Sequence, residues 1–156
     1  MIVKSMLMFY EDFAEGQKFV SQERIITSDD IQKFADLTRD FNKLHLDPEF
    51  AKSVGFSGPI SHGMLTLSFA IGLWHSLDLT NGTTLAFAGL SNVAFKAPVY
   101  PGDKLHIEAQ FLSKRDLRSR PEAGLVTLKL VGLNSEKMVL ETELALIIKK
   151  RSSNRN

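Results

Sequence analysis

The sequence predicts a single domain of the α+β class, in which a curved antiparallel sheet wraps around one long apolar helix. Residues 53–77 contain no Asp, Glu, Lys or Arg, and four later segments alternate apolar and polar side chains in the manner of strands. No second long helix is indicated. Because a helix that is apolar on nearly every side must be enclosed by other structure, the sheet has to cover it. The length of 156 residues suits one domain of this kind.

The first part of the chain mixes strand and helix signals. Residues 18–26 are predicted to be a strand, and the capping and acidic side chains that follow begin a three-turn helix over 29–38. Residues 39–46 are too irregular to continue that helix, so we expect a loop there. Pro48 suits the first position of a short helix over 48–53, with an aspartate before it as the cap.

The second part of the chain contains the long helix and the sheet. The helix is predicted to begin at Ser61 or His62 and to end near Leu77. After an Asn-Gly pair that suits a turn, the strand pattern covers residues 84–96, 104–114, 124–133 and 138–149. Turn-forming residues stand at the breaks. Four long consecutive strands of this kind form an antiparallel sheet.

Composition and charge exclude several function classes. The chain has no cysteine, which excludes cysteine nucleophiles, dithiol redox pairs, cysteine-ligated zinc and iron–sulfur clusters. The formal net charge is +1, and four of the 19 Lys and Arg residues lie in the last eight positions. Nucleic-acid-binding domains concentrate positive charge on a folded face, so we do not expect one here. We expect one domain over 1–148 and a basic, disordered tail over 149–156.

No targeting or membrane segment is indicated. The apolar run Met6–Tyr10 is shorter than the core of a signal peptide. The apolar stretch Met64–Trp74 is well short of the ~20 residues that a membrane-spanning helix needs. We therefore expect a cytoplasmic protein without a membrane span.

Asp40, Asn42 and His45 form the first group of residues that could carry chemistry. Residues five apart on an α-helix point about 140° away from each other, so Asp40 and His45 can meet only if their segment is a loop. An Asp–His pair in a sheltered loop suits acid–base chemistry near neutral pH. The alternative is that Asp40 and Asn42 cap backbone groups and that His45 is an ordinary surface residue.

The segment 59–65 places small and polar residues where the long helix begins. The N–H groups in the first turn of a helix lack internal partners and carry partial positive charge, so they can hold an anion or a developing oxyanion. Gly63 would let a carbonyl group approach the backbone closely. The alternative is a plain helix cap with a glycine that serves only packing.

No metal centre or nucleotide loop is predicted. The four histidines show no close metal-ligand spacing. The glycines at 55, 58 and 63 are not followed by the Gly-Lys-Ser/Thr of a phosphate-binding loop.

Taken together, these segments resemble the MaoC-like hydratase/dehydratase family, whose best-known members are (R)-specific enoyl-CoA hydratases with a hotdog fold. The family motif D-x-N-P-[LIV]-H is matched by residues 40–45, which read Asp-Phe-Asn-Lys-Leu-His. The likeness continues through Pro-Ile-Ser-His-Gly-Met-Leu at 59–65 and through Phe-x-x-Pro-Val-x-x-Gly-Asp at 95–103. It covers nearly the whole chain and is sharpest over 34–65.

The resemblance implies a hotdog fold and the reversible hydration of 2-enoyl thioesters to (R)-3-hydroxyacyl thioesters. Asp40 and His45 would hold a water molecule as the acid–base pair, and the N–H of Gly63 would polarise the thioester carbonyl. No cofactor and no metal ion are implied. Coenzyme A, or the pantetheine of an acyl carrier protein, is part of the substrate.

Substrate binding is expected from four further residues that lie within the same three motif segments, namely Asn42, Ser61, His62 and Lys96. Asn42 would shape the loop and orient His45. The phosphates of coenzyme A could be met by basic side chains at Lys96, Lys114, Arg115 and Arg118. The alternative is that these four are ordinary solvated surface charges.

The sequence departs from the family pattern at two positions. Lys43 stands where the family usually has proline, so the loop is less pre-set and carries an extra charge. Ile71 stands where some relatives place a serine that supports the aspartate. These departures keep open a non-catalytic module that binds acyl thioesters, and a hotdog acyl-CoA thioesterase is a further alternative. Residues 62–77 contain no Asp or Glu, which counts against the thioesterase.

A homodimer is also expected. A single hotdog unit leaves one sheet edge and one apolar face uncovered, and such surfaces favour pairing. The resemblance implies that the sites lie near the subunit interface.

Overall fold

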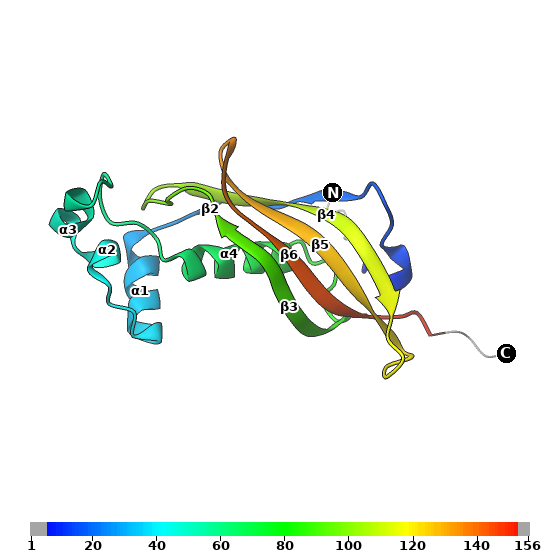
Figure 1. The fold of residues 1–156 in the computed structure, drawn as a ribbon. Helices are drawn as coiled ribbons and strands as arrows, with labels where there is room; N and C mark the ends of the chain where they lie inside the picture. The colour runs from blue at the N-terminus through cyan, green and yellow to red at the C-terminus, as the bar shows by residue number, and fades with distance from the viewer. Residues whose placement is uncertain (1–5, 153–156) are drawn as a thin grey trace.

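The computed structural model describes residues 6–152, which form a six-stranded sheet around one central helix (Figure 1). Within these residues no helix is both long and apolar enough to cross a membrane. The elements, in chain order, are the 3-10 turn η1 (Tyr10–Asp12), β1 (Lys18–Val20), β2 (Arg24–Ile25), α1 (Ser28–Thr38), α2 (Lys43–Leu46), α3 (Pro48–Ser53), α4 (Gly63–Ser76), β3 (Thr84–Phe95), β4 (Lys104–Asp116), β5 (Ala123–Asn134) and β6 (Lys137–Lys149).

The sheet is antiparallel throughout and has the strand order β1-β4-β5-β6-β3, with β2 also paired to β4. The four long strands follow the predicted segments closely, because their alternating side chains bury one face of the sheet. β3 is an edge strand, and its register with β6 shifts at three places along its length. These features confirm the predicted α+β class and the predicted arrangement of sheet and helix.

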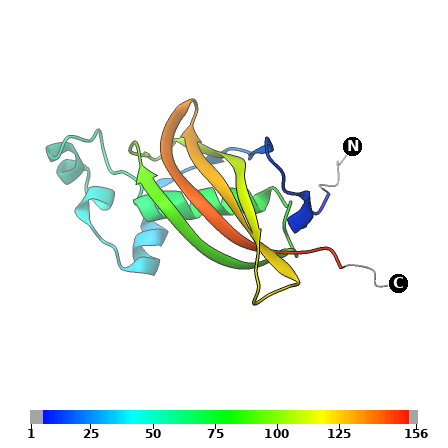
Figure 2. The ribbon, with the colours of Figure 1, turned by 45° about the vertical axis from the view of Figure 1, so that its right-hand side comes forward.

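The core lies between α4 and the concave face of the sheet, along which α4 runs (Figure 2). Leu67 and Trp74 of α4 belong to one buried cluster with Ile107, Leu128 and Leu144 of the sheet. Because α4 is apolar on nearly every side, the sheet and the N-terminal segment both have to cover it. The N-terminal segment contributes Phe19, whose ring packs edge-on against Trp74 at 5.5 Å between centroids.

The strand predicted over 18–26 is divided into β1 and β2, both of which pair with β4. Ser21 lies at the break. Its backbone N–H donates to the carbonyl of Ile107, and its hydroxyl accepts the N–H of the same residue. The Ser21 hydroxyl therefore replaces a backbone carbonyl as the acceptor for the Ile107 N–H. The strand is interrupted, but this buried N–H remains paired.

The loop predicted over 39–46 contains one helical turn, α2, so this expectation was wrong in part. Asn42 precedes α2 and accepts a hydrogen bond of 3.0 Å from the N–H of Leu44 with its side chain. This cap starts the turn, and the N–H of Asp47 closes it on the carbonyl of Lys43. Lys43, at the position where proline is usual in the family, is the first residue of this turn.

The start of the expected tail is held against the N-terminal turn. β6 runs to Lys149. Lys150 pairs with Asp116 at 2.8 Å, and Arg151 pairs with Asp12 at 2.6 Å. Residues 150 and 151, which belong to the tail expected over 149–156, therefore contact the folded domain. The last four residues of the chain lie outside the described residues.

Helices α1, α2 and α3 gather at one end of the sheet, beside the first turn of α4 (Figure 1). The ring of Phe34 in α1 contacts the ring of His62 at 4.9 Å between centroids. The carbonyl of Leu44 in α2 accepts the N–H of Ile60 at 3.4 Å. The segment before α4 is thus enclosed by the small helices, which brings the two sequence motifs together.

Candidate active site

Asp40 is positioned by a change of backbone direction at the end of α1. Arg39 adopts a left-handed conformation, with φ 67°, and its N–H closes the helix on the carbonyl of Ala35. The chain then turns toward α4. The Asp40 carboxylate accepts the N–H of Asn42 at 3.2 Å, and this short-range bond fixes the turn in which Asp40 lies.

His45 projects from α2 and is oriented by a backbone carbonyl. Its Nδ1 lies 2.8 Å from the carbonyl oxygen of Ile60, just before α4. Since a carbonyl oxygen can only accept, Nδ1 carries the proton of a neutral ring and Nε2 carries the lone pair. The imidazole therefore presents a proton acceptor at Nε2.

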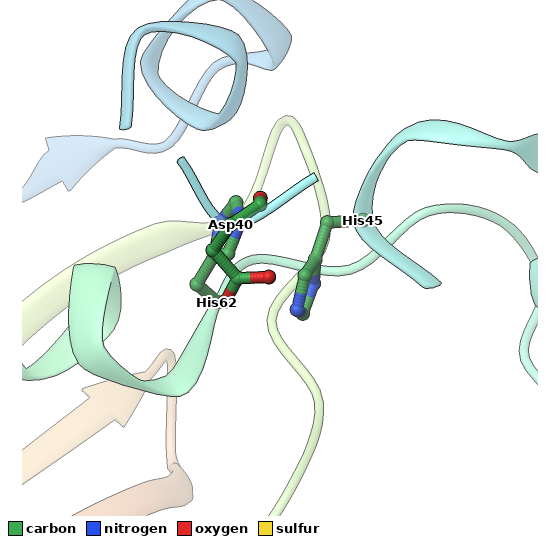
Figure 3. Close-up of side chains that lie close together, drawn as sticks. All are labelled: Asp40, His45 and His62. Carbon is green, nitrogen blue, oxygen red and sulfur yellow. The ribbon is translucent and has the colours of Figure 1, made fainter. Parts of the chain in front are cut away.

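Asp40, His45 and His62 come together at the start of α4. One ligating atom of each lies within 4.8 Å of those of the other two. Figure 3 shows the Asp40 carboxylate directed toward the His45 ring, with His62 beside Asp40. The structure thus brings together Asp40 and His45, as the motif required, and adds His62 as a third member.

His62 is the most deeply buried of the three, with 2% of its surface exposed. Its Nε2 lies 3.1 Å from the backbone carbonyl oxygen of Asp40, and its ring contacts that of His45 at 3.8 Å between centroids. Burial lowers the pKa of His62 below its usual value, because a charged ring would be poorly solvated there. Its Nδ1 has no hydrogen-bond partner among residues 6–152.

Gly63 begins α4 next to this group. The preceding residue, His62, makes no side-chain capping bond, so the N–H groups of the first turn are left without a side-chain partner. The ring of Phe95, at the end of β3, lies directly against the Cα of Gly63. No other residue type would leave the same approach to the backbone at this point.

A cavity of about 410 Å³ opens between His45 and the start of α4. Its wall is mainly apolar, with polar groups contributed by Ser61, Thr66 and Lys96. Gly63 and His45 both line it, whereas His62 lies behind the wall. A second cavity, of about 500 Å³, lies on the α1 side and shares His45 with the first. The His45 imidazole therefore lies between the two cavities and lines both.

The other residues expected to bind substrate differ in the hydrogen bonds and ion pairs that they already make. The Ser61 hydroxyl accepts from Thr66 at 3.0 Å and lies 3.2 Å from the carbonyl of His62, to which it donates. Asn42 is exposed, and its side chain caps α2. Lys96 lines the cavity but pairs with Glu141 at 2.9 Å, and this bond lowers the pKa of Glu141.

Lys114 was expected to be available for substrate phosphates, and the structure gives it another role. Its ammonium group donates to the carbonyl oxygens of Tyr10, Glu11 and Phe13 at 3.2, 3.1 and 2.7 Å. These carbonyls belong to η1 and to the residue that follows it. Lys114 therefore fastens the N-terminal turn to β4, far along the chain from the candidate site.

The cluster of Asp40, His45 and His62 offers a carboxylate and two imidazole rings for proton transfer, and the same three residues are close enough together to hold a metal ion. One nitrogen of each ring donates to a backbone carbonyl, which leaves the other nitrogen as an acceptor in the neutral ring.

Sequence reasoning did not identify the contact of His62 with the acid–base pair. His62 was expected to bind substrate because it lies in the second motif. The bond from His62 to Asp40 spans 22 residues along the chain, and no local spacing signals it. The apolar residue at 71 is partly buried and packs against the core. It offers no hydrogen bond to an aspartate.

Comparison with known proteins identifies close relatives in sequence. The (R)-specific enoyl-CoA hydratase of Aeromonas caviae is 38% identical over 112 residues, which cover 72% of this chain and 79% of that one. The 3-hydroxyacyl-thioester dehydratase Z of Mycobacterium tuberculosis is 34% identical over 106 residues, which cover 67% and 70% of the two chains.

Solved structures agree with the fold. A protein of Archaeoglobus described as a monoamine oxidase regulatory protein superposes with a TM-score of 0.86 at 36% identity, covering 94% of this chain and 97% of that chain. A double-hotdog protein of Mycobacterium tuberculosis matches with a TM-score of 0.83 at 18% identity, covering 96% and 46% of the two chains, and supports the fold alone. The model of the MaoC like domain matches residues 12–132. The chain is therefore a member of the MaoC-like hydratase/dehydratase family and has the hotdog fold of that family.

Proposed function

We propose that the protein reversibly hydrates 2-enoyl thioesters to (R)-3-hydroxyacyl thioesters. The observation that carries the proposal is the arrangement of three groups at and beside one cavity. The Asp40 carboxylate lies beside His45, and His45 and Gly63, at the N-terminus of α4, both line the cavity; in the neutral His45 ring, Nε2 is the proton acceptor. The names of the sequence relatives support the reaction class, and the (R) configuration follows that of the Aeromonas hydratase.

The acid–base pair would activate water. A water molecule held between Asp40 and His45 bonds through its oxygen to Cβ of the enoyl thioester and gives one proton to the pair. The pair returns one proton to Cα, so it ends in its starting protonation state. The product is the 3-hydroxyacyl thioester, and the same steps in reverse dehydrate it. Acid–base catalysis of this kind contributes about 10² to 10⁴ in rate.

The start of α4 would stabilise the charge that develops during this addition. When water attacks Cβ, negative charge gathers on the thioester carbonyl oxygen. The N–H of Gly63, together with the partial positive charge of the helix N-terminus, is suited to that oxygen. One such donor typically lowers the barrier by about 2.7–4 kcal/mol.

Substrate binding is assigned to the cavity wall. Ser61 and Lys96 line the cavity and are proposed to contact the thioester and its carrier. Asn42 is proposed to orient His45 by starting α2. The reaction needs neither a cofactor nor a metal ion. The carrier is coenzyme A or the pantetheine arm of an acyl carrier protein.

We also propose that the working form is a homodimer joined along β3. This edge strand is 12 residues long, and its outer backbone groups have no strand beside them within residues 6–152. Leu85, Phe87, Val93 and Phe95 are exposed along it. A second copy of β3 would satisfy the backbone groups and cover these side chains together. Phe95 also lines the cavity, so such an interface would lie beside the site.

The proposed reaction is tested by mixing the purified full chain with crotonyl-CoA and following the loss of enoyl absorbance. Chiral analysis of the product then gives its configuration. Absence of turnover with short, long and branched 2-enoyl thioesters would refute the proposal. Release of free thiol in the same assay would instead identify a thioesterase, which the absence of Asp and Glu from α4 disfavours.

A further inference from the structure

His62 lies between two other rings and contacts both. On one side its ring contacts that of Phe34 in α1, at 4.9 Å between centroids. On the other side it lies against His45 of α2, at 3.8 Å. With 2% of its surface exposed, His62 cannot shift without disturbing both neighbours. The position of the His45 ring is therefore set partly by His62.

A hydrogen bond connects the same ring to the other member of the acid–base pair. Because a carbonyl oxygen only accepts, Nε2 of His62 donates its proton to the backbone carbonyl of Asp40 at 3.1 Å. Asp40 is exposed and follows the left-handed turn at the end of α1. The Asp40 backbone N–H and the Asp40 carboxylate bond to near neighbours in sequence, whereas the bond from His62 connects the Asp40 backbone to the start of α4.

The geometry also favours one charge state of His62. With Nε2 committed to the Asp40 carbonyl, a second proton would have to sit on Nδ1, which is buried and has no partner among the described residues. The titratable groups that face the ring are His45 from α2 and Asp40 from the turn, and α1 presents only the Phe34 ring. A neutral His62 satisfies these surroundings better than a charged one.

We infer that His62 is a positioning residue that holds Asp40 and His45 in their working geometry as a neutral ring, and that it does not itself contact substrate. This inference rests on the proposed hydratase function. It differs from the expectation, drawn from the motif alone, that His62 binds substrate. A residue that positions the acid–base pair from behind the cavity wall affects the rate of the chemical step more than substrate affinity.

Two variants separate the two contacts of His62. His62→Phe keeps a ring between Phe34 and His45 but removes the donor to Asp40, whereas His62→Gln keeps an N–H donor but removes the ring. Each is expected to lower kcat for crotonyl-CoA hydration about 10- to 100-fold, because displacements of about 1 Å at a reacting group have effects of this size. KM is expected to change by less than about twofold. His75→Gln, on the last turn of α4, serves as the control and should retain kcat.

A measurement without turnover keeps the test independent of the proposed reaction. Nitrogen NMR of the wild-type histidines should show the Nε2–H tautomer for His62 and the Nδ1–H tautomer for His45. In either variant the His45 signals should shift or broaden. If wild type lacks hydratase activity, the proposed function fails, and these spectra still decide the role of His62.

Three results would overturn the inference. One is a rise in KM at constant kcat, which would show direct contact with substrate. Another is unchanged kcat together with unchanged His45 signals in both variants. The third is an Nδ1–H tautomer of His62 in the wild type. This measurement decides the inference even if both variants fail to fold.

Discussion

A β-carbon built on Gly63 would lie 3.0 Å from Cζ of Phe95, so the last residue of β3 closes over the first residue of α4. We predict that Gly63→Ala pushes the Phe95 ring outward and blocks the approach of the thioester carbonyl to the helix N-terminus. The expected loss in kcat/KM is about 10- to 100-fold. The measurement is hydration of crotonyl-CoA under steady-state conditions.

Gly72, on the same helix, supplies the matched control. A β-carbon there meets no atom within 4 Å. Gly72→Ala should therefore retain activity and raise stability by about 0.5–1 kcal/mol, because alanine is the better helix former. Full activity of Gly63→Ala would show that close approach to the backbone is not needed.

The acid–base pair can be tested by nearly isosteric changes. Asp40→Asn and His45→Gln should each lower kcat by about 10² to 10⁴, since each removes a proton-transfer group. Asp40 is exposed and His45 is only partly buried, so thermal unfolding should change little. Activity within about tenfold of wild type in both variants would contradict the assigned roles.

The fold was predictable because its signals are local in the sequence. Alternation along β5 and β6 is visible in the residues themselves, and the uncharged segment that contains α4 can be recognised without knowledge of its neighbours. The break between β1 and β2 was not predictable, because it depends on Ser21 bonding to Ile107, a residue 86 positions away. The turn α2 was missed because one capping side chain starts it within an otherwise irregular segment.

The motif predicted that Asp40 and His45 lie together, and the structure shows this contact. The contact depends on Arg39 turning the chain and on the small helices enclosing the start of α4, neither of which the motif indicates. Which nitrogen of His45 is free depends on the carbonyl of Ile60, which no residue pattern encodes. The partners of Lys96 and Lys114 also depend on the tertiary structure, and they engage two ammonium groups that the sequence alone left available.

Lys96 offers a test of the carrier. Its ammonium pairs with Glu141 at 2.9 Å, at an exposed position beside the cavity. If Lys96 meets a phosphate of coenzyme A, Lys96→Met should raise KM for crotonyl-CoA about two- to fivefold, the size expected of an exposed ion pair. Glu141→Gln should lower KM by a similar factor because it frees the lysine. Both effects should vanish with crotonyl-pantetheine, which lacks the nucleotide phosphates, and equal effects on both substrates would disprove the phosphate contact.

The proposed dimer is tested at the exposed edge. Phe87 of β3 is 48% exposed, and a charge there would be buried in a pair of β3 strands. Phe87→Glu should convert a dimer into a monomer, as measured by light scattering during gel filtration, because an unpaired buried charge is costly. Leu37→Glu changes a residue that is 83% exposed on α1 and should leave the mass unchanged. A wild-type chain that is monomeric would refute the proposal directly.

Burial of His62 predicts a specific loss of stability in mild acid. Burial holds the pKa of His62 below its usual value, whereas in the unfolded chain the group titrates near about 6.5. Between these two values the unfolded chain binds more protons, so the free energy of unfolding falls as pH drops through about 6.5. Urea unfolding of wild type between about pH 7.5 and pH 5 should show this fall, and His62→Gln should have a shallower dependence because one such group is gone.

Ile31→Val, a buried change without a titratable group, should lower stability by about 0.5–1.5 kcal/mol at every pH. If His62→Gln retains the full pH dependence, His62 is charged as readily in the folded chain as in the unfolded one, and the requirement for a neutral ring fails.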